Sequence, residues 1–327
     1  MGNSRARIDV LIVGGGIAGL WLLDELHRCG YATLLITKGN LGQGQSIAAQ
    51  GIIHGGTKYF GETSVADLAA MPERWRASLA GDTGPDLSTA SPLATAMQMW
   101  LPPQLGGGLL AGFSQKAMRG RMREAPKDTW PNCVAGATGG HLFELDEIVV
   151  DVPAILTALH AAHADRIRQI PDDCAFEVTS NGRQGAVIGI DDYEIETQFF
   201  VFAAGAGNDE LTITDGSGTI IGGTGADTIH IRASAGSTTL NAGDGADTIN
   251  VAGLAPVFDP GAGGDADGVT GQLRINGDGS DDTLSVDDSG DGTGDTGRLE
   301  AKTISGIFGA GGSITYNTFE ALQIDLG

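Results

Sequence analysis

The first forty residues alternate between apolar runs and glycine in a pattern that predicts a strand, a turn, a helix and a second strand. Residues 9–13 form a short apolar run, which suits a buried parallel strand. Residues 17–29 place apolar side chains at helical spacing and end before Gly30, and residues 32–37 supply a second apolar run. The segment therefore predicts a β–α–β unit that opens an α/β domain.

Later patterning predicts more of the same domain and then a different architecture. Residues 96–101 predict a strand, and together with a segment around residues 143–151 they fit the start of a further domain. Residues 152–164 predict a helix, and residues 199–205 predict an apolar strand that ends in Ala-Gly. From residue 208 onward, apolar positions recur in short runs separated by glycine and aspartate. This second pattern predicts an all-β region of short strands and tight turns.

The glycines between the first strand and the first helix predict a nucleotide site. The turn reads GGGIAG over residues 14–19, and it directly follows the strand and opens the helix. In that context Gly14 makes the tight turn beside Gly15, Gly16 lets the backbone approach a pyrophosphate, and Gly19 lets helix and strand pack closely. Phosphates then lie at the helix N-terminus, where free N–H groups favour anions.

The second strand lacks the acidic residue that holds a ribose in many such sites. It ends in Ile36-Thr37-Lys38. Thr37 is the candidate for a weaker hydrogen bond to a ribose hydroxyl. Lys38 suits a 2′-phosphate, but the segments that follow point to flavin instead.

Two glycine-rich segments after the second strand carry a family resemblance. They are Gly42-Gln43-Gly44-Gln45-Ser46 and Gln50-Gly51-Ile52-Ile53-His54-Gly55-Gly56. Over residues 8–207 the chain resembles FAD-dependent oxidoreductases of the D-amino-acid and glycine oxidase-like family. The resemblance implies a Rossmann-type fold, FAD as cofactor, and hydride transfer from a small-molecule substrate to the flavin.

The resemblance also assigns roles to particular residues. It places Ser46 at the FAD phosphates, Gln50 and Gly51 beside the flavin ring, and Gly205 near the adenine. His54 is implied to lie near the ring, with a packing or hydrogen-bonding role as the alternative to a catalytic one. No catalytic residue is identified, because the resemblance ends near Asn208, before the segments that orient the substrate in this family. The flavin half is therefore expected to be catalytically incomplete.

Beyond residue 205 a G-x-G-x-D motif recurs, and it resembles the nonapeptide of RTX-type calcium-binding β-rolls. Copies begin at Gly205, Gly223, Gly243 and Gly277. The resemblance implies a β-solenoid that binds calcium. Its candidate ligands are Asp209, Asp227, Asp247 and Asp281, since carboxylates and turn carbonyls suit this cation. The alternative is a solenoid whose aspartates only cap turns. Residues 287–292 imitate the start of an EF-hand loop, but Arg298 stands where the bidentate glutamate belongs.

Charge and composition support a boundary near residue 207. Residues 1–207 carry a net charge of −7, residues 208–327 carry −15, and the second part holds 25 of the 53 glycines. We therefore predict two domains, an FAD-binding part at 1–207 and a glycine- and aspartate-rich β-solenoid at 208–327. Such acidity disfavours nucleic acid and anionic membranes as partners, because both require a basic surface. No apolar run reaches the about 20 residues of a membrane span, and glycines interrupt the only stretch resembling a signal peptide.

The two parts suggest different compartments. Three scattered cysteines, Cys29, Cys133 and Cys174, predict buried, reduced thiols and a cytoplasmic flavin half. Calcium-binding repeats suit the extracellular space. A natural fusion is one explanation of this conflict. The preferred explanation is a reading frame that joins two truncated genes at the Gly-Ala-Gly-Asn-Asp motif of residues 205–209. The favoured function is an FAD-dependent oxidoreductase. The rival is a calcium-binding structural or adhesive repeat protein with an N-terminal passenger.

Overall fold

The computed structural model describes most of the chain and divides it into two compact units. The described residues are 4–54, 65–103, 122–171, 176–180, 186–190, 193–206, 210–213, 215, 217–252, 263–292 and 294–326. The first unit combines residues 1–46 with 163–327, and the second comprises residues 47–162. The predicted domain boundary near residue 207 falls inside the first unit and stays a prediction.

The first unit contains the predicted β–α–β unit. Strand β1 (Ser4–Val13) leads into helix α1 (Ile17–Arg28), which returns to strand β2 (Thr33–Lys38). β1 and β2 pair in parallel, and β2 pairs in parallel with β9 (Ile167–Ile170). The centre of β1 is fully buried, as its apolar sequence predicts. The short helix α2 (Gln45–Ala48) follows β2, and the 3-10 turn η4 (Ala164–Arg166) precedes β9.

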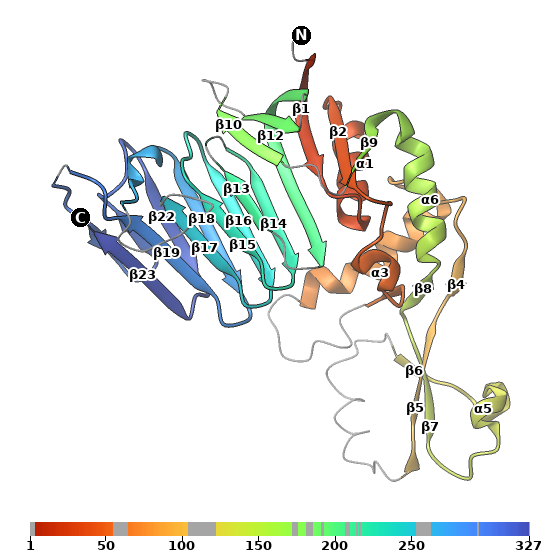
Figure 1. Cartoon of the computed structure of the whole chain (residues 1–327). Helices are drawn as coiled ribbons and strands as arrows, with labels where there is room; N and C mark the ends of the chain where they lie inside the picture. The colour runs from red at the N-terminus through yellow and green to blue at the C-terminus, as the bar shows by residue number, and fades with distance from the viewer. Residues whose placement is uncertain are drawn as a thin grey trace. The chain divides into compact units, whose positions relative to one another are not determined.

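Strand β12 (Tyr193–Ala206) joins the nucleotide-binding strands to the rest of the first unit. One edge of β12 pairs in parallel with β1, and the other edge pairs in parallel with β14, as Figure 1 shows. The predicted strand at residues 199–205 is confirmed and is the carboxyl end of β12. A single strand therefore belongs to both sequence patterns.

Strands β12 to β23, residues 193–326, form what we call the stacked-strand region. Ten of its strands make two parallel stacks. From β12 to β17 each strand pairs with the second strand along the chain, and β18 and β19 then pair with β22 and β23. The first stack is β12, β14 (Thr219–Thr224), β16 (Thr238–Asp244), β18 (Gln272–Asp278) and β22 (Ser313–Asn317). The second stack is β13 (Glu210–Ile213), β15 (Thr228–Ile231), β17 (Thr248–Ala252), β19 (Thr283–Asp288) and β23 (Ala321–Leu326).

Smaller elements flank the stacks. β10 (Phe176–Ser180) and β11 (Ala186–Ile190) form a hairpin whose second strand pairs antiparallel with β12. β20 (Arg298–Leu299) and β21 (Thr303–Ser305) form a second antiparallel pair, and β21 also pairs with β22. The 3-10 turn η5 (Ala266–Gly268) completes this region.

One hydrophobic core runs through the first unit. Alternate residues of the stacked strands point inward, so that Ile220, Leu240 and Ile275 lie in register and are at most 1% exposed. The same buried cluster includes Leu11 of β1 and Phe200 of β12. Burying apolar side chains from both parts in one cluster makes their stabilities interdependent.

The second unit is a smaller α+β assembly. Its described residues form two three-stranded antiparallel sheets and three helices. The strands are β3 (Ile52–Ile53), β4 (Pro92–Ala94), β5 (Met97–Leu101), β6 (Met122–Glu124), β7 (His141–Leu145) and β8 (Ile148–Val150). The helices are α3 (Val65–Ala80), α5 (Asn132–Ala135) and α6 (Val152–His163), and η3 (Lys127–Thr129) is a 3-10 turn. The strand predicted at residues 96–101 and the helix predicted at residues 152–164 are confirmed as β5 and α6, and the segment around residues 143–151 contains the end of β7 and all of β8.

Two expectations from the sequence concern the cysteine side chains and membrane-spanning segments. Cys29 and Cys133 are exposed free thiols, so the prediction of buried cysteines is wrong for both. Cys29 follows the last turn of α1, outside the apolar face of that helix. Cys174 lies outside the described residues. Among the helices that the structure describes, none is long and apolar enough to cross a bilayer.

Candidate dinucleotide-binding site

The glycine turn at the carboxyl end of β1 is shaped by close backbone contacts. Gly14 has a φ of +127°, and a Cβ there would lie 2.1 Å from the carbonyl oxygen of Ala203 in β12. A Cβ on Gly19 would lie 2.0 Å from the carbonyl oxygen of Gly14. Only glycine fits at both positions, because one supports a left-handed turn and the other lets helix α1 pack on it. These are the roles that the sequence predicts for Gly14 and Gly19.

The next two glycines lie against polar side chains. A Cβ on Gly15 would lie 2.3 Å from the Thr37 hydroxyl, and one on Gly16 would lie 3.2 Å from the Ser46 hydroxyl. Thr37 is only 4% exposed, and its hydroxyl donates to the Lys38 carbonyl oxygen at 3.2 Å. Thr37 therefore packs under the turn, and its predicted hydrogen bond to a ribose stays a prediction.

Ser46 caps helix α1, which begins where the glycine turn ends. The backbone N–H of Ile17, the first residue of α1, donates to Ser46 Oγ at 2.9 Å. Gly16 is the N-cap residue and has no side chain for this purpose. The remaining N–H groups of the first turn point beyond the helix end, where they and the helix dipole favour an anion.

Strand order gathers the predicted residues of the first unit at one edge of the sheet. Val13 of β1 stands opposite Ile36 of β2 and Phe202 of β12 in the parallel register. The turn glycines, Thr37 and Gly205 all follow these positions, so they lie at the carboxyl ends of adjacent strands. Ligands of open α/β sheets bind at that edge.

The comparisons with known proteins identify the family of this arrangement. The family model for FAD-dependent oxidoreductases of the DAO type matches residues 9–262. The chain belongs to this family. FAD is the cofactor of the family, and the glycine turn with its capped helix N-terminus fits the pyrophosphate of that group.

The chain is also similar to individual proteins of known sequence or structure. A probable FAD-dependent oxidoreductase of Pseudomonas aeruginosa, PA4991, is 41% identical over 208 residues, which are 62% of this chain and 52% of that protein. The crystal structure of PA4991 is similar over 63% of this chain and 49% of that chain, with a TM-score of 0.51 and 35% identity. A glycine oxidase from Geobacillus kaustophilus is similar at 20% identity over 62% of this chain and 56% of that chain, with a TM-score of 0.47.

The chain spans about half the length of the relatives that it matches. The expected catalytic incompleteness, the two compartments and the two explanations of the joined sequence patterns all stay predictions.

Residues predicted to lie beside the flavin ring belong to the second unit. Gly51 has a φ of +69°, and a Cβ there would lie 2.3 Å from the carbonyl oxygen of Val150. Its own carbonyl accepts from Val150 N–H at 2.8 Å, so contact with β8 already requires glycine. Gln50 is exposed. The flavin contacts of Gln50 and Gly51 stay predictions.

His54 has a partner that the sequence does not reveal. Its Nδ1 lies 3.3 Å from Oε2 of Glu147, whose side chain is 1% exposed. The pairing of β3 with β8 brings these residues together across 93 positions of sequence. This contact supports the hydrogen-bonding role for His54, which the sequence analysis left open beside a catalytic one.

The predicted calcium ligands form a different arrangement from the one expected. Asp227 and Asp247 are 2% and 1% exposed, and the backbone N–H of Asp227 donates to Asp247 Oδ1 at 2.8 Å. The backbone N–H of Asp247 donates to Asp282 Oδ1 at 2.9 Å. Asp282 therefore continues this series of contacts, whereas Asp281 is exposed, and the predicted calcium-ligand roles stay predictions. Asp209 lies outside the described residues.

We call Asp227, Asp247, Asp282 and Glu320 the carboxyl column. It continues to Glu320, whose Oε2 accepts from Asp282 N–H at 2.8 Å. Burial, together with the charges of Asp227, Asp282 and Asp278, raises the pKa of Asp247 to about 6. Burial likewise raises the pKa of Asp282. These contacts are the turn-capping alternative of the sequence analysis, since the carboxylates accept backbone N–H groups.

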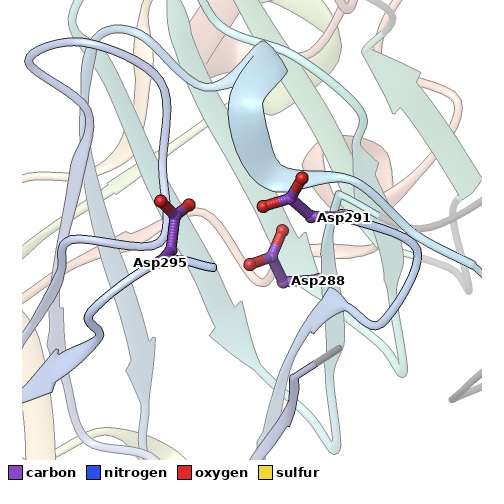
Figure 2. A group of neighbouring side chains, drawn as sticks. All are labelled: Asp288, Asp291 and Asp295. Carbon is purple, nitrogen blue, oxygen red and sulfur yellow. The ribbon is translucent and has the colours of Figure 1, made fainter. Parts of the chain in front are cut away.

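A separate acidic group lies near the turn that imitates an EF-hand. Carboxylate oxygens of Asp288, Asp291 and Asp295 lie within 4.8 Å of one another. Figure 2 shows these three neighbouring side chains. Asp288 is 4% exposed, and its Oδ1 accepts from Ala266 N–H at 3.0 Å. Burial and the neighbouring carboxylates raise the pKa of Asp288. Sequence spacing indicated the turn but did not single out Asp295.

Sequence reasoning also missed a buried polar group beneath the nucleotide-binding strands. Asp24 of α1 is 6% exposed, accepts from Arg28 Nε at 2.8 Å, and lies 2.9 Å from His163 Nε2. The ring of His27 packs edge-on against His163 at 5.4 Å. Asp24 lies on the otherwise apolar face of α1. A charged residue at such a position is the signal in the sequence that could have revealed this buried polar group.

Proposed function

We propose that this chain binds FAD through its first unit and takes part in an FAD-dependent oxidation of the amino-acid-oxidase-like class. The single observation that carries the proposal is the GGGIAG turn, whose helix N-terminus is capped by Ser46 from outside the helix. The family match supports FAD over other dinucleotides. When bound, FAD supplies the acceptor for a hydride from the substrate.

The residues of this chain bind and orient the cofactor in this proposal. The N–H groups of the first turn of α1 receive the pyrophosphate, and the backbone of Gly14 to Gly16 permits close approach. Gly205 lies at the end of β12, where the family resemblance places the adenine. The proposal keeps the roles that the family resemblance gives to Gln50, Gly51 and His54, which are contacts near the flavin ring.

A charge placed at the helix N-terminus tests cofactor binding separately from folding. Gly16→Asp puts a good N-cap side chain at the start of α1, so helix stability is retained, but its carboxylate repels the pyrophosphate. We expect purified wild-type protein to elute with flavin absorption after incubation with FAD, and Gly16→Asp to elute without it. Gly136→Asp is the matched control, because it adds the same charge outside the glycine-rich segments and a Cβ at Gly136 meets nothing within 4 Å. Equal FAD binding by both variants, or a colourless wild type, contradicts the proposal.

Calcium binding by the stacked-strand region is the second candidate, and we infer a β-solenoid of the β-roll type for it. The observation in its favour is the proximity of the Asp288, Asp291 and Asp295 carboxylates. Calorimetric titration with Ca²⁺ tests it, with Asp295→Asn as the variant and Asp281→Asn as the control. We expect Asp295→Asn to remove one binding event. A wild-type protein that takes up no Ca²⁺ at millimolar concentration contradicts this candidate.

A further inference from the structure

The short helix that carries Ser46 is held by polar contacts. None of the residues of α2 is buried, so apolar packing does not determine its position. Ser46 Oγ accepts from Ile17 N–H at 2.9 Å and lies next to Gly16, where the pyrophosphate is proposed to bind. The position of Ser46 therefore depends on the few hydrogen bonds that hold its segment.

One of these hydrogen bonds comes from the stacked-strand region. The side-chain amide of Gln45, the residue before Ser46, donates to the hydroxyl of Thr224. Thr224 is the last residue of β14, 179 positions away in sequence. The loop before α2 has other anchors, because Gly42 N–H donates to the Gly15 carbonyl at 2.8 Å. Thr224 thus adds a contact to this segment at the residue next to Ser46.

Stacked glycines bring Thr224 to the edge of the sheet where the nucleotide turn lies. Gly205, Gly223 and Gly243 stand opposite one another in β12, β14 and β16. Each has a positive φ, and a Cβ on Gly223 or Gly243 would lie within 2.0 Å of the carbonyl oxygen of the preceding glycine. Thr224 follows Gly223 directly, so it continues the row of strand ends begun by Gly14 and Gly205.

We propose that Thr224 is a positioning residue of the dinucleotide site. Its hydroxyl holds Gln45, Gln45 fixes the position of Ser46, and Ser46 caps the helix that receives the pyrophosphate. The stacked-strand region thereby contributes to cofactor affinity without touching the cofactor. This inference rests on the proposed function, and it adds a residue outside the glycine turn to that site.

A set of conservative variants tests the chain of contacts in the full-length protein. Thr224→Val removes the hydroxyl at nearly constant volume, and Gln45→Met removes the amide. We expect each to raise the dissociation constant for FAD about 3- to 10-fold, which is the effect of losing one hydrogen bond. The double variant is expected to lose no more than either single variant. Thr224→Ser keeps the hydroxyl and should bind FAD like the wild type. Thr219→Val, at the start of the same strand, is the control.

A second readout does not require FAD. Hydrogen exchange of the amides in residues 15–20 and 43–48 should become at least about 3-fold faster in Thr224→Val and remain unchanged in Thr219→Val. Unchanged exchange and affinity in Thr224→Val overturn the proposal, and so do losses that multiply in the double variant. A wild-type protein that binds no FAD contradicts the proposed function alone, and the exchange comparison then decides whether Thr224 positions Ser46.

Discussion

At the scale of single residues, Asp247 is the clearest case of a carboxyl group in an unfavourable electrostatic environment. Its side chain is 1% exposed, one oxygen accepts the Asp227 N–H, and the other oxygen is buried without a hydrogen-bond partner. The groups that face it are the carboxyls of Asp227, Asp282 and Asp278. No cation compensates Asp247 among these neighbours, so its ionised form is disfavoured.

Stability should therefore fall as Asp247 ionises. Its pKa rises from 3.8 to about 6 in the folded chain, so the folded form holds its proton more tightly than the unfolded form. The stabilisation is complete below pH 4 and is lost as the pH rises through 6. The stability of Asp247→Asn relative to the wild type should thus increase by about 2–3 kcal/mol between pH 4 and pH 7. Urea unfolding at the two pH values measures it.

The control for this prediction lies in a neighbouring turn. Asp281→Asn removes an exposed carboxylate, and its stability relative to the wild type should stay within about 0.5 kcal/mol at both pH values. If the two variants respond equally to pH, the carboxyl column is not the origin of the effect.

At the scale of elements, side chains from other segments form hydrogen bonds with both halves of helix α1. Ser46 caps its N-terminus. The buried contact between Asp24 and His163 links its C-terminal half to the segment that precedes β9. A removed partner in a buried polar pair leaves the other group desolvated and uncompensated. These two contacts set the position of α1 relative to the sheet.

Removing Asp24 should therefore destabilise the first unit markedly. We expect Asp24→Ala to lower the free energy of unfolding by about 3 kcal/mol, because His163 and Arg28 lose a buried acceptor. Glu25→Ala is the control, since Glu25 also pairs with Arg28 but the contact is exposed, and it should cost less than about 1 kcal/mol. Chemical denaturation measures both variants. Similar losses for the two variants contradict this account of α1.

The stacked strands depend on glycine where their ends meet. Gly243 has a φ of +108°, and a Cβ there would lie 2.0 Å from the carbonyl oxygen of Gly223. Gly243→Ala should therefore cost about 3 kcal/mol or more, through backbone strain and separation of the strands. Gly279→Ala, where a Cβ meets nothing within 4 Å, should cost less than about 1 kcal/mol. The melting temperatures compare the two, and equal shifts would argue against close stacking of β14 and β16.

At the scale of the whole molecule, the first unit unites two sequence patterns in one sheet and one core. β12 pairs with β1 on one side and with β14 on the other. Leu11 and Val13 share a buried cluster with residues as distant as Ile275 and Ile314. Unfolding of the stacked strands should therefore also unfold the nucleotide-binding strands.

Cavity formation far from the glycine turn tests this coupling. Ile275 is 1% exposed, and Ile275→Ala should cost about 2–4 kcal/mol. We expect the temperature of FAD release, followed by flavin fluorescence, to fall by roughly 5–10 °C together with the far-UV transition. Leu299→Ala, at a side chain 58% exposed, should change neither. Flavin release that stays at the wild-type temperature in Ile275→Ala means that the two parts unfold independently.

Much of the nucleotide-binding part could be predicted from sequence because its signals are local. The strand, the GGGIAG turn and the helix lie within thirty residues, and the required glycines show directly in the spacing. The roles of Gly14 and Gly19 follow from backbone geometry that only glycine permits. The sequence could not reveal Thr37 packed under the turn, since that depends on how β2 pairs with β1.

Features that depend on distant partners were hidden in the sequence. One extra residue in the fourth repeat made Asp281 appear equivalent to Asp247, but the register of β17 with β19 places Asp282 beside it. His163 is buried against Asp24, a contact across 139 positions that no local sequence pattern reveals. Turn and strand formation follow from residues that are neighbours along the chain, whereas strand register and the burial of polar groups follow from contacts that exist only after the chain has packed.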